Sequence, residues 1–156
     1  MPFDQRETTV TRIPPRMRSF AVTNRQDAIL IAPQARRLAL GFGLGGKRSA
    51  EIAIVVSELA TNIAKHGTRG EIVVILDDDA PPRGEMTVLA RDIGPPIHDL
   101  ALAMSDGYDD RGPIDPSLLL HRGGLGTGLG AVLRLSDRFE YQELEVGKEI
   151  RVRYFR

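Results

Sequence analysis

The spacing of hydrophobic residues divides the chain into helices and strands. The clearest pattern lies at residues 52–63, where apolar residues recur every three or four positions and predict a helix with one buried stripe. An earlier helix is expected from Asp27, as its cap, to about Leu40, and Pro33 should kink it or delay its start. The apolar side of this earlier helix is expected to consist of Leu30, Ile31, Ala35, Leu38 and Ala39.

Alternation of apolar and polar residues predicts the strands. Five strands are expected, at residues 20–23, 71–76, 86–92, 139–145 and 149–155. The segment DDDAPPRG (77–84) is short enough to close a hairpin, and short helices are expected at 99–104 and 131–135. Helices grouped with antiparallel strands favour an α+β fold, a two-layer sandwich of a mostly antiparallel sheet with helices on one face.

Composition narrows the classes of partner and site. The 156 residues contain 21 basic and 21 acidic side chains, and this balance argues against a nucleic-acid or membrane partner. The absence of cysteine excludes disulfides and thiolate metal sites. Without a signal peptide or a long apolar run, a cytoplasmic protein is expected. We expect a flexible arm at residues 1–17 and one domain at residues 18–156.

Two glycine clusters are candidates for binding phosphate. In GFGLGGKRS (41–49), Gly41, Gly46 and Lys47 fit the P-loop pattern, but Arg48 stands where a serine or threonine is needed. The preceding segment also reads as a helix rather than a strand. We therefore interpret this cluster as a turn between helices, and a P-loop NTPase is the less favoured alternative.

The second cluster, GGLGTGLG (123–130), has glycine at every second position from residue 124 to residue 130. Such a segment lets backbone N–H groups approach an anion, and the helix expected after it adds further unpaired N–H groups. A flexible linker is the alternative interpretation. The second cluster is the better candidate for a phosphate site.

Three polar residues elsewhere could support such a site. Glu58 and Asn62 lie four residues apart, on one flank of the predicted helix. A carboxylate can accept a proton from an attacking hydroxyl, and an amide oxygen can hold Mg²⁺. Asp92, followed by Ile93 and Gly94, ends a predicted strand and could accept a hydrogen bond from a base. The plainer alternatives are a solvated helix flank for the pair and a turn-forming role for Asp92.

Taken in order, these features resemble the N, G1 and G2 boxes of the GHKL ATPase superfamily. The resemblance is strongest to the small serine kinases of bacterial partner switching, of the RsbT/RsbW type, and runs from about residue 18 to the C terminus. The segments that carry it are SELATNIAKHG (57–67), ARDIGPPI (90–97), MSDGY (104–108) and GGLGTGLGAVLRLSDRF (123–139).

The resemblance implies a histidine kinase-like (Bergerat) ATP-binding fold, with ATP and Mg²⁺ as cofactors. Asn62 would hold Mg²⁺, Glu58 would act as the base for a serine hydroxyl, and Asp92 would bind the adenine amino group. Gly94 would let the purine approach, and residues 98–122 would form a lid over the ATP. The residues lining the triphosphate would be Gly124, Leu125, Gly126, Thr127 and Gly128.

The same resemblance implies a serine/threonine protein kinase that phosphorylates a STAS-domain antagonist. Its further partner would be a sigma factor or a PP2C-type phosphatase, and the oligomeric state is left open. The chain departs from the family at Pro96, where a second glycine is usual, and at Lys148, where a threonine commonly helps to bind adenine. The expected lid also carries an extra stretch at residues 109–121. These departures favour the alternative of a non-catalytic binding module with the same fold.

Overall fold

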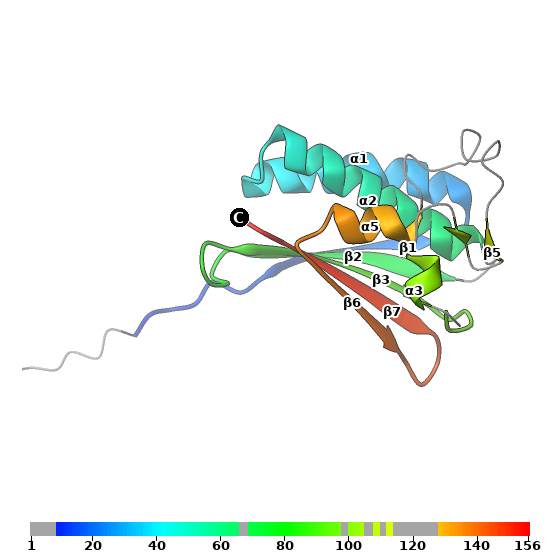
Figure 1. Cartoon of the computed structure of the whole chain (residues 1–156). Coiled ribbons are helices and arrows are strands. Elements are labelled where there is room, and N and C mark those ends of the chain that lie inside the picture. The colour runs from blue at the N-terminus through cyan, green and yellow to red at the C-terminus, as the bar shows by residue number, and fades with distance from the viewer. Residues whose placement is uncertain (1–8, 66–68, 98–99, 105–107, 110–111, 114–127) are drawn as a thin grey trace, which may run out of the picture.

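The protein is described by a computed structural model, which covers residues 9–65, 69–97, 100–104, 108–109, 112–113 and 128–156 (Figure 1). Helices and strands form two layers, with α1, α2 and α5 on one face of a sheet. The helices are α1 (Arg25–Phe42), α2 (Gly46–Lys65), α3 (Leu100–Ala103) and α5 (Leu129–Arg134). The strands are β1 (Arg16–Val22), β2 (Gly70–Asp77), β3 (Glu85–Asp92), β4 (Tyr108–Asp109), β5 (Gly112–Pro113), β6 (Arg138–Glu143) and β7 (Lys148–Phe155).

The main sheet has the strand order β1-β2-β3-β7-β6, and each neighbouring pair is antiparallel. The predicted α+β two-layer architecture is therefore confirmed, as is the hairpin β2–β3, and β6 and β7 form a second hairpin. The C-terminal strand β7 lies between β3 and β6, so it is an interior strand of the sheet (Figure 1). Strands β4 and β5, of two residues each, pair with each other in a stretch for which no strand was expected.

Helix α1 begins earlier than the sequence suggested. Its cap is Asn24, whose side chain accepts a hydrogen bond from the Asp27 backbone, while the Asp27 carboxylate accepts one from the Asn24 N–H. Asp27 is therefore the third residue of a capping box rather than the cap itself. Pro33 lies inside the helix and does not delay its start. Leu30 is 64% exposed, because the buried stripe runs through Ala28, Ile31, Ala35, Ala39 and Phe42 instead.

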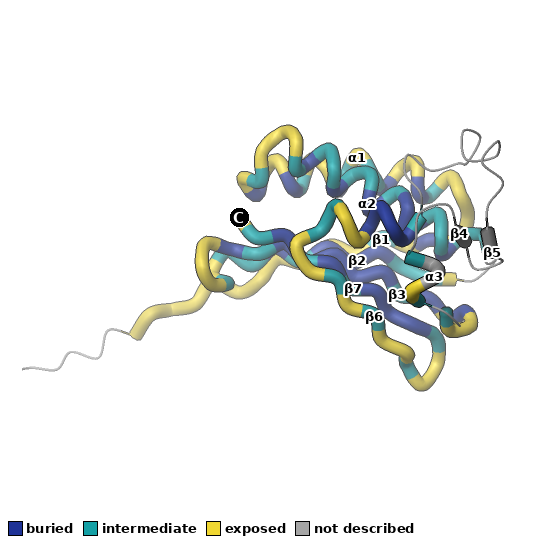
Figure 2. The backbone as a smooth tube through the Cα atoms, viewed as in Figure 1, coloured by how far each residue is buried: buried dark blue, intermediate teal, exposed yellow. Residues whose placement is uncertain are grey.

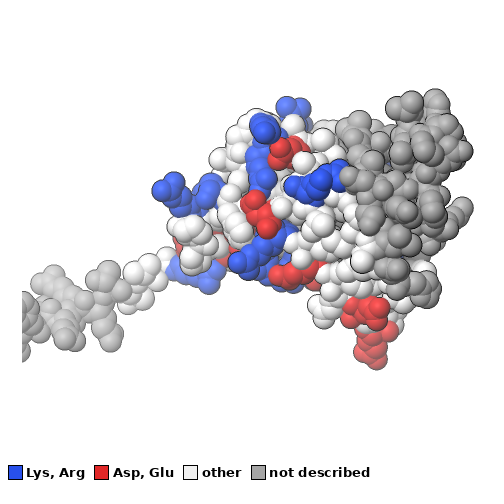
Figure 3. Space-filling view, in the orientation of Figure 1, with Lys and Arg blue, Asp and Glu red and all other residues white. Residues whose placement is uncertain are grey.

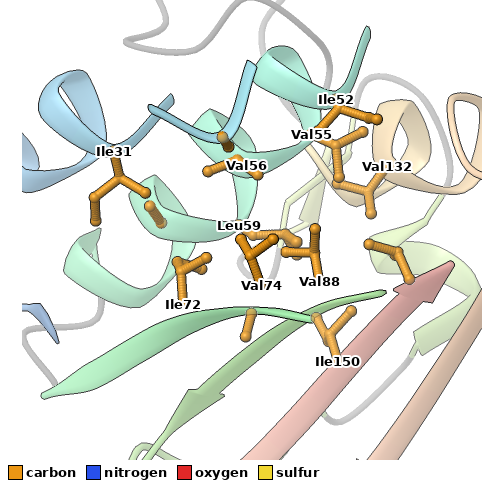
Figure 4. Packing of buried hydrophobic residues seen from close by; sticks show 14 of the residues in the cluster. Ile31, Ile52, Val55, Val56, Leu59, Ile72, Val74, Val88, Val132 and Ile150 are labelled. Carbon is orange, nitrogen blue, oxygen red and sulfur yellow. The ribbon is translucent and has the colours of Figure 1, made fainter. Parts of the chain in front are cut away.

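Helix α2 carries the predicted stripe and forms the centre of the core. The buried side chain of Leu59 faces Val74 and Val88 of the sheet, and Val55 lies against Val132 of α5 (Figure 4). Burial is concentrated in β2, β3 and β7 and on the sheet-facing sides of the helices, whereas the edge strands β1 and β6 are largely exposed (Figure 2). Full burial of each large aliphatic side chain contributes about 1.5–3 kcal/mol to folding. This packing fixes the position of α2 over the central strands.

The face of the sheet opposite the helices, here called the outer face, carries charged residues in a ladder. Arg91 Nε donates to Glu149 at 2.6 Å, and Arg151 contacts the same carboxylate at 3.4 Å. Arg153 lies 3.6 Å from Glu85. Arg151 and Arg153 therefore alternate with the buried Ile150, Val152 and Tyr154 along the last strand. Positive and negative side chains are also interspersed over the surface seen in Figure 3.

The first strand reaches further toward the N terminus than expected. Arg16 and Met17, placed by the sequence in the arm, pair with Leu76 and Ile75 of β2. Before them, Arg12 forms a 2.7 Å ion pair with Asp77. Among the residues described, none belongs to a helix long and apolar enough to cross a membrane.

Candidate functional site

Helix α2 places Glu58 and Asn62 on one flank, as their spacing predicted. Glu58 is only 6% exposed, and Asn62 is half-buried. A carboxylate is seldom buried to this degree on an ordinary surface helix. The alternative of a solvated helix flank therefore does not apply to Glu58. A buried carboxylate beside a more accessible amide suits a proton acceptor next to a cation ligand.

Asp92 is the last residue of β3, and its side chain lies on the face of the sheet that carries the helices. It shares this face with Met86, Val88 and Ala90, and it is 6% exposed. Its Oδ1 atom accepts a hydrogen bond from the Gly94 N–H at 2.8 Å. This contact two residues along the chain is the turn-forming interaction proposed as the alternative role. A turn-forming role does not exclude a second contact through the carboxylate.

Lys148 provides that second contact. It is the first residue of β7, is directly paired with Asp92 across the sheet, and is 3% exposed. Its Nζ atom donates to Asp92 Oδ1 at 2.9 Å and to the Pro95 carbonyl oxygen at 2.9 Å. A buried charge is stable only when it is paired and hydrogen-bonded, and both conditions hold here. Lys148, where the sequence departs from the pattern it resembles, is therefore a direct and buried neighbour of the candidate site residue Asp92.

Three further residues that sequence reasoning did not assign to the site shape the region around Asp92. The Tyr141 hydroxyl accepts a hydrogen bond from the Ile97 N–H at 3.0 Å and so holds the segment after β3. Gly147 has φ +90°, and a side chain there would collide with the Asp92 carbonyl. A side chain at Gly70 would collide with the Arg91 carbonyl. Glycine beside a strand end was the only signal in the sequence for either close approach.

The first glycine cluster is a turn between helices, as interpreted. Gly43 caps α1 with φ +95°, Gly45 has φ +79°, and α2 starts at the next residue. Arg48 points inward, where it contacts Asp137 and lies 5.1 Å from the centre of the Tyr154 ring. A helix rather than a strand precedes the cluster, so the P-loop alternative is wrong. Arg48 is occupied in structural contacts within the protein.

The second glycine cluster is only partly described. Gly128 precedes α5 with φ +74°, a backbone conformation that favours glycine. Helix α5 has six residues, so it adds less to an anion site than a long helix would. Gly124, Leu125, Gly126 and Thr127 lie outside the described residues, as does most of the expected lid at 98–122.

The candidate donor groups for Mg²⁺ and ATP are one amide and two carboxylates, those of Asn62, Glu58 and Asp92. The described residues contain no group of three or more acidic, histidine or cysteine side chains that could hold a metal ion by themselves. Mg²⁺ is, however, commonly held by one or two protein oxygens together with substrate phosphates and waters. The amide oxygen of Asn62 fits that type of site. Glu58, buried on α2, has the chemistry of a base, and Asp92, buried at the end of β3, has that of a nucleobase acceptor.

A cavity of about 380 Å³ also borders Asp92, but it opens on the outer face. Its lining includes Ser19, Glu71 and Arg91, whose side chains point away from the helices. Glu58, on α2, is on the other side of the sheet. We therefore do not assign this cavity to the nucleotide.

Comparison with known proteins places the chain in a family. Residues 23–154 match the model of the histidine kinase-like ATPase domain. The chain belongs to this family. Within it, the serine/threonine-protein kinase RsbT of Bacillus subtilis (strain 168) is 33% identical over 113 residues, covering 72% of this chain and 76% of RsbT. The resemblance to RsbT/RsbW-type kinases is thus confirmed.

A solved structure agrees with this histidine kinase-like ATPase fold. The crystal structure of the RsbU and RsbW domains of Rv1364c from Mycobacterium tuberculosis matches with a TM-score of 0.57 over 91% of this chain, at 15% identity. The match spans 32% of that longer chain. Family membership implies an ATP-binding domain with kinase-like activity in general terms, and the site roles above remain predictions.

Proposed function

We propose that this chain is an ATP- and Mg²⁺-dependent protein serine/threonine kinase of a bacterial partner-switching system. Its substrate would be a STAS-domain antagonist, and its alternative partner a sigma factor or a PP2C-type phosphatase. The observation that chiefly supports the proposal is the 33% identity to the kinase RsbT over 72% of the chain. We also propose that residues 18–156 form the kinase domain, with residues 1–17 as an arm.

The proposed reaction transfers the γ-phosphoryl group of ATP to a serine hydroxyl. The bond from the γ-phosphorus to the bridging oxygen of ADP breaks as a bond to the serine oxygen forms, and Glu58 takes the hydroxyl proton. Asn62 would hold Mg²⁺, which would neutralise charge on the phosphates, and Asp92 would orient the base. Phosphoryl transfer depends mainly on such positioning and charge neutralisation, which one buried carboxylate and one amide can serve.

Glu58→Gln tests the proposal. Because only proton transfer is removed, the variant should keep ATP and partner binding but lose roughly 10²–10⁴-fold in phosphorylation rate. The measurement is transfer of labelled phosphate to purified candidate STAS proteins. Glu51→Gln is the matched control, seven residues earlier on the same helix, where Glu51 pairs with Arg48 at 3.5 Å. Equal rates for wild type and Glu58→Gln would remove Glu58 from the proposed role.

A second candidate function is a non-catalytic binding module, and the buried Lys148–Asp92 pair favours it. A cation already bound to Asp92 competes with the amino group of an adenine. If wild type binds a STAS protein tightly but transfers no phosphate to it, this second function replaces the first.

A further inference from the structure

The ion pair between Asp92 and Lys148 lies where the proposed function places the nucleobase. The two side chains are 4% and 3% exposed. Asp92 Oδ1 accepts from Lys148 Nζ at 2.9 Å and from the Gly94 N–H at 2.8 Å. A carboxylate oxygen offers about two lone-pair sites, so this oxygen already has its full complement of donors.

Lys148 is held in place by several independent contacts. The antiparallel register sets it directly opposite Asp92, and its Nζ atom also donates to the Pro95 carbonyl at 2.9 Å. The turn before it packs on the Asp92 backbone, where Gly147 leaves no space for a side chain. The ammonium group is therefore fixed beside the carboxylate rather than being a mobile surface lysine.

Adenine and guanine differ in the hydrogen-bonding group that they would present to such a pair. Adenine presents an amino donor at its 6 position, and that donor needs an acceptor such as a carboxylate. An ammonium group already bound to the carboxylate fills an acceptor oxygen and neutralises the charge that would make the hydrogen bond strong. Guanine has an acceptor oxygen at the same position, which a lysine does not disfavour. The pair should thus weaken adenine binding selectively.

We propose that Lys148 is a specificity-determining residue that removes the preference for adenine, so that the nucleotide is held mainly through its phosphates. This inference rests on the proposed function, because it takes Asp92 as the acceptor for the base. Beyond the proposed function, the inference states that the wild-type protein distinguishes ATP from GTP poorly and that Lys148 alone is the cause.

Calorimetric titration with Mg·ATP and Mg·GTP tests the inference. Wild type should bind the two nucleotides with affinities within about threefold of each other. Lys148→Thr leaves the Asp92 carboxylate open to the base, and should tighten ATP binding by about tenfold, the order of one hydrogen bond to a charged group. Its GTP affinity should change less than about threefold. Lys148→Arg keeps the cation and should keep the wild-type ratio.

A second variant shows whether the gain acts through Asp92. In Asp92→Asn/Lys148→Thr the carboxylate is absent, so the tenfold gain for ATP should disappear. Melting temperatures measured without nucleotide report the stability of each variant, separately from the ratio of its ATP and GTP affinities. A purely structural role for Lys148 would change the melting temperature without changing the ratio of ATP to GTP affinity.

Several outcomes would overturn the inference. One is a wild type that prefers ATP over GTP by tenfold or more. The others concern a folded Lys148→Thr variant: it keeps the wild-type ratio of affinities, loses ATP affinity, or binds neither nucleotide. If Lys148→Thr does not fold, the wild-type ratio decides alone. The proposed kinase function and the inference fail separately. A wild type that shows the expected ratio but transfers no phosphate contradicts the kinase function alone, and one that phosphorylates its partner with a strong preference for ATP contradicts the inference alone.

Discussion

At the scale of single residues, the informative contrast is between Glu58 and Asn62. They lie one helical turn apart, yet Glu58 is 6% exposed and Asn62 is half-buried. The difference arises because α2 turns its stripe of apolar residues toward the sheet, and the flank beside that stripe is covered to different depths along the helix. Burial raises the pKa of a carboxyl group in general and so makes the carboxylate a stronger proton acceptor. A Mg²⁺ ligand, in contrast, must stay accessible to waters and phosphates.

We predict that Asn62→Ala weakens Mg·ATP binding by at least roughly tenfold, the order found when groups that support metal ligands are removed. The fold should remain intact, because the side chain does not belong to the apolar core cluster. ATP titrations in Mg²⁺ and in a chelator separate metal-dependent from metal-independent binding. Without metal, wild type and Asn62→Ala should bind ATP with similar affinities. Thr61→Ala, also half-buried on α2, is the control. A loss of the same size in the chelator would argue against a metal ligand at Asn62.

At the scale of elements, the start of α2 is joined to the sheet by Arg48. Its guanidinium contacts Asp137 between α5 and β6, and it lies over the Tyr154 ring of β7 at 5.1 Å. Asp137 also accepts a hydrogen bond from the Phe155 N–H at 2.9 Å. Burial alone would raise the pKa of Asp137, but these hydrogen bonds and the Arg48 charge together lower it. The contact therefore stabilises the fold through an ionised carboxylate.

The lowered pKa of Asp137 sets the direction of a pH effect. A carboxylate whose folded pKa lies below its unfolded value of about 3.9 adds stability above that value and loses it as the pH falls through the folded pKa. We predict that Asp137→Asn reduces the free energy of unfolding by about 1 kcal/mol at pH 7 and by less near pH 3. Urea unfolding at both pH values measures this. Arg48→Met should reduce the same pH-dependent component, and an unchanged pH profile in both variants would contradict the interpretation.

At the scale of the whole molecule, the first glycine cluster lies far from Asn62. Helix α2 has 20 residues and is about 30 Å long, so Lys47 lies about 22 Å along its axis from Asn62. The turn between α1 and α2 is at the opposite end of the molecule from α3 and the β6–β7 turn (Figure 1). That turn borders its own cavity of about 370 Å³, lined by residues that include Lys47 and Arg48. One nucleotide site cannot use both ends of α2.

We predict that Lys47→Ala leaves nucleotide affinity within about twofold of wild type, because Lys47 lies far from Asn62. Gly128→Ala should weaken it clearly, since φ +74° strains an alanine at the end of the segment proposed to hold the phosphates. Nucleotide titration of both variants, with melting temperatures as a check on folding, decides between the clusters. A strong loss in Lys47→Ala with none in Gly128→Ala would reverse the assignment.

The sequence by itself determined the elements and the type of fold. Hydrophobic residues repeat with the period of a helix in α2 and with that of a strand in β2 and β3, and these periods depend only on neighbours along the chain. The order of three short motifs was enough to predict the family. The cap of α1 was misplaced by three residues, because Asn24 and Asp27 both favour helix starts and only the hydrogen bonds distinguish their roles.

Tertiary structure alone decided what the polar residues contact. Asp92 and Lys148 are 56 residues apart and meet because β7 inserts beside β3 in one particular register. Arg48 is bound to Asp137, 89 positions later in the sequence, for a similar reason. Strand order and register follow from how all the apolar faces pack together, and no local pattern contains that information. The burial of Lys148, and with it the proposed effect on nucleotide choice, is therefore a property of the assembled sheet.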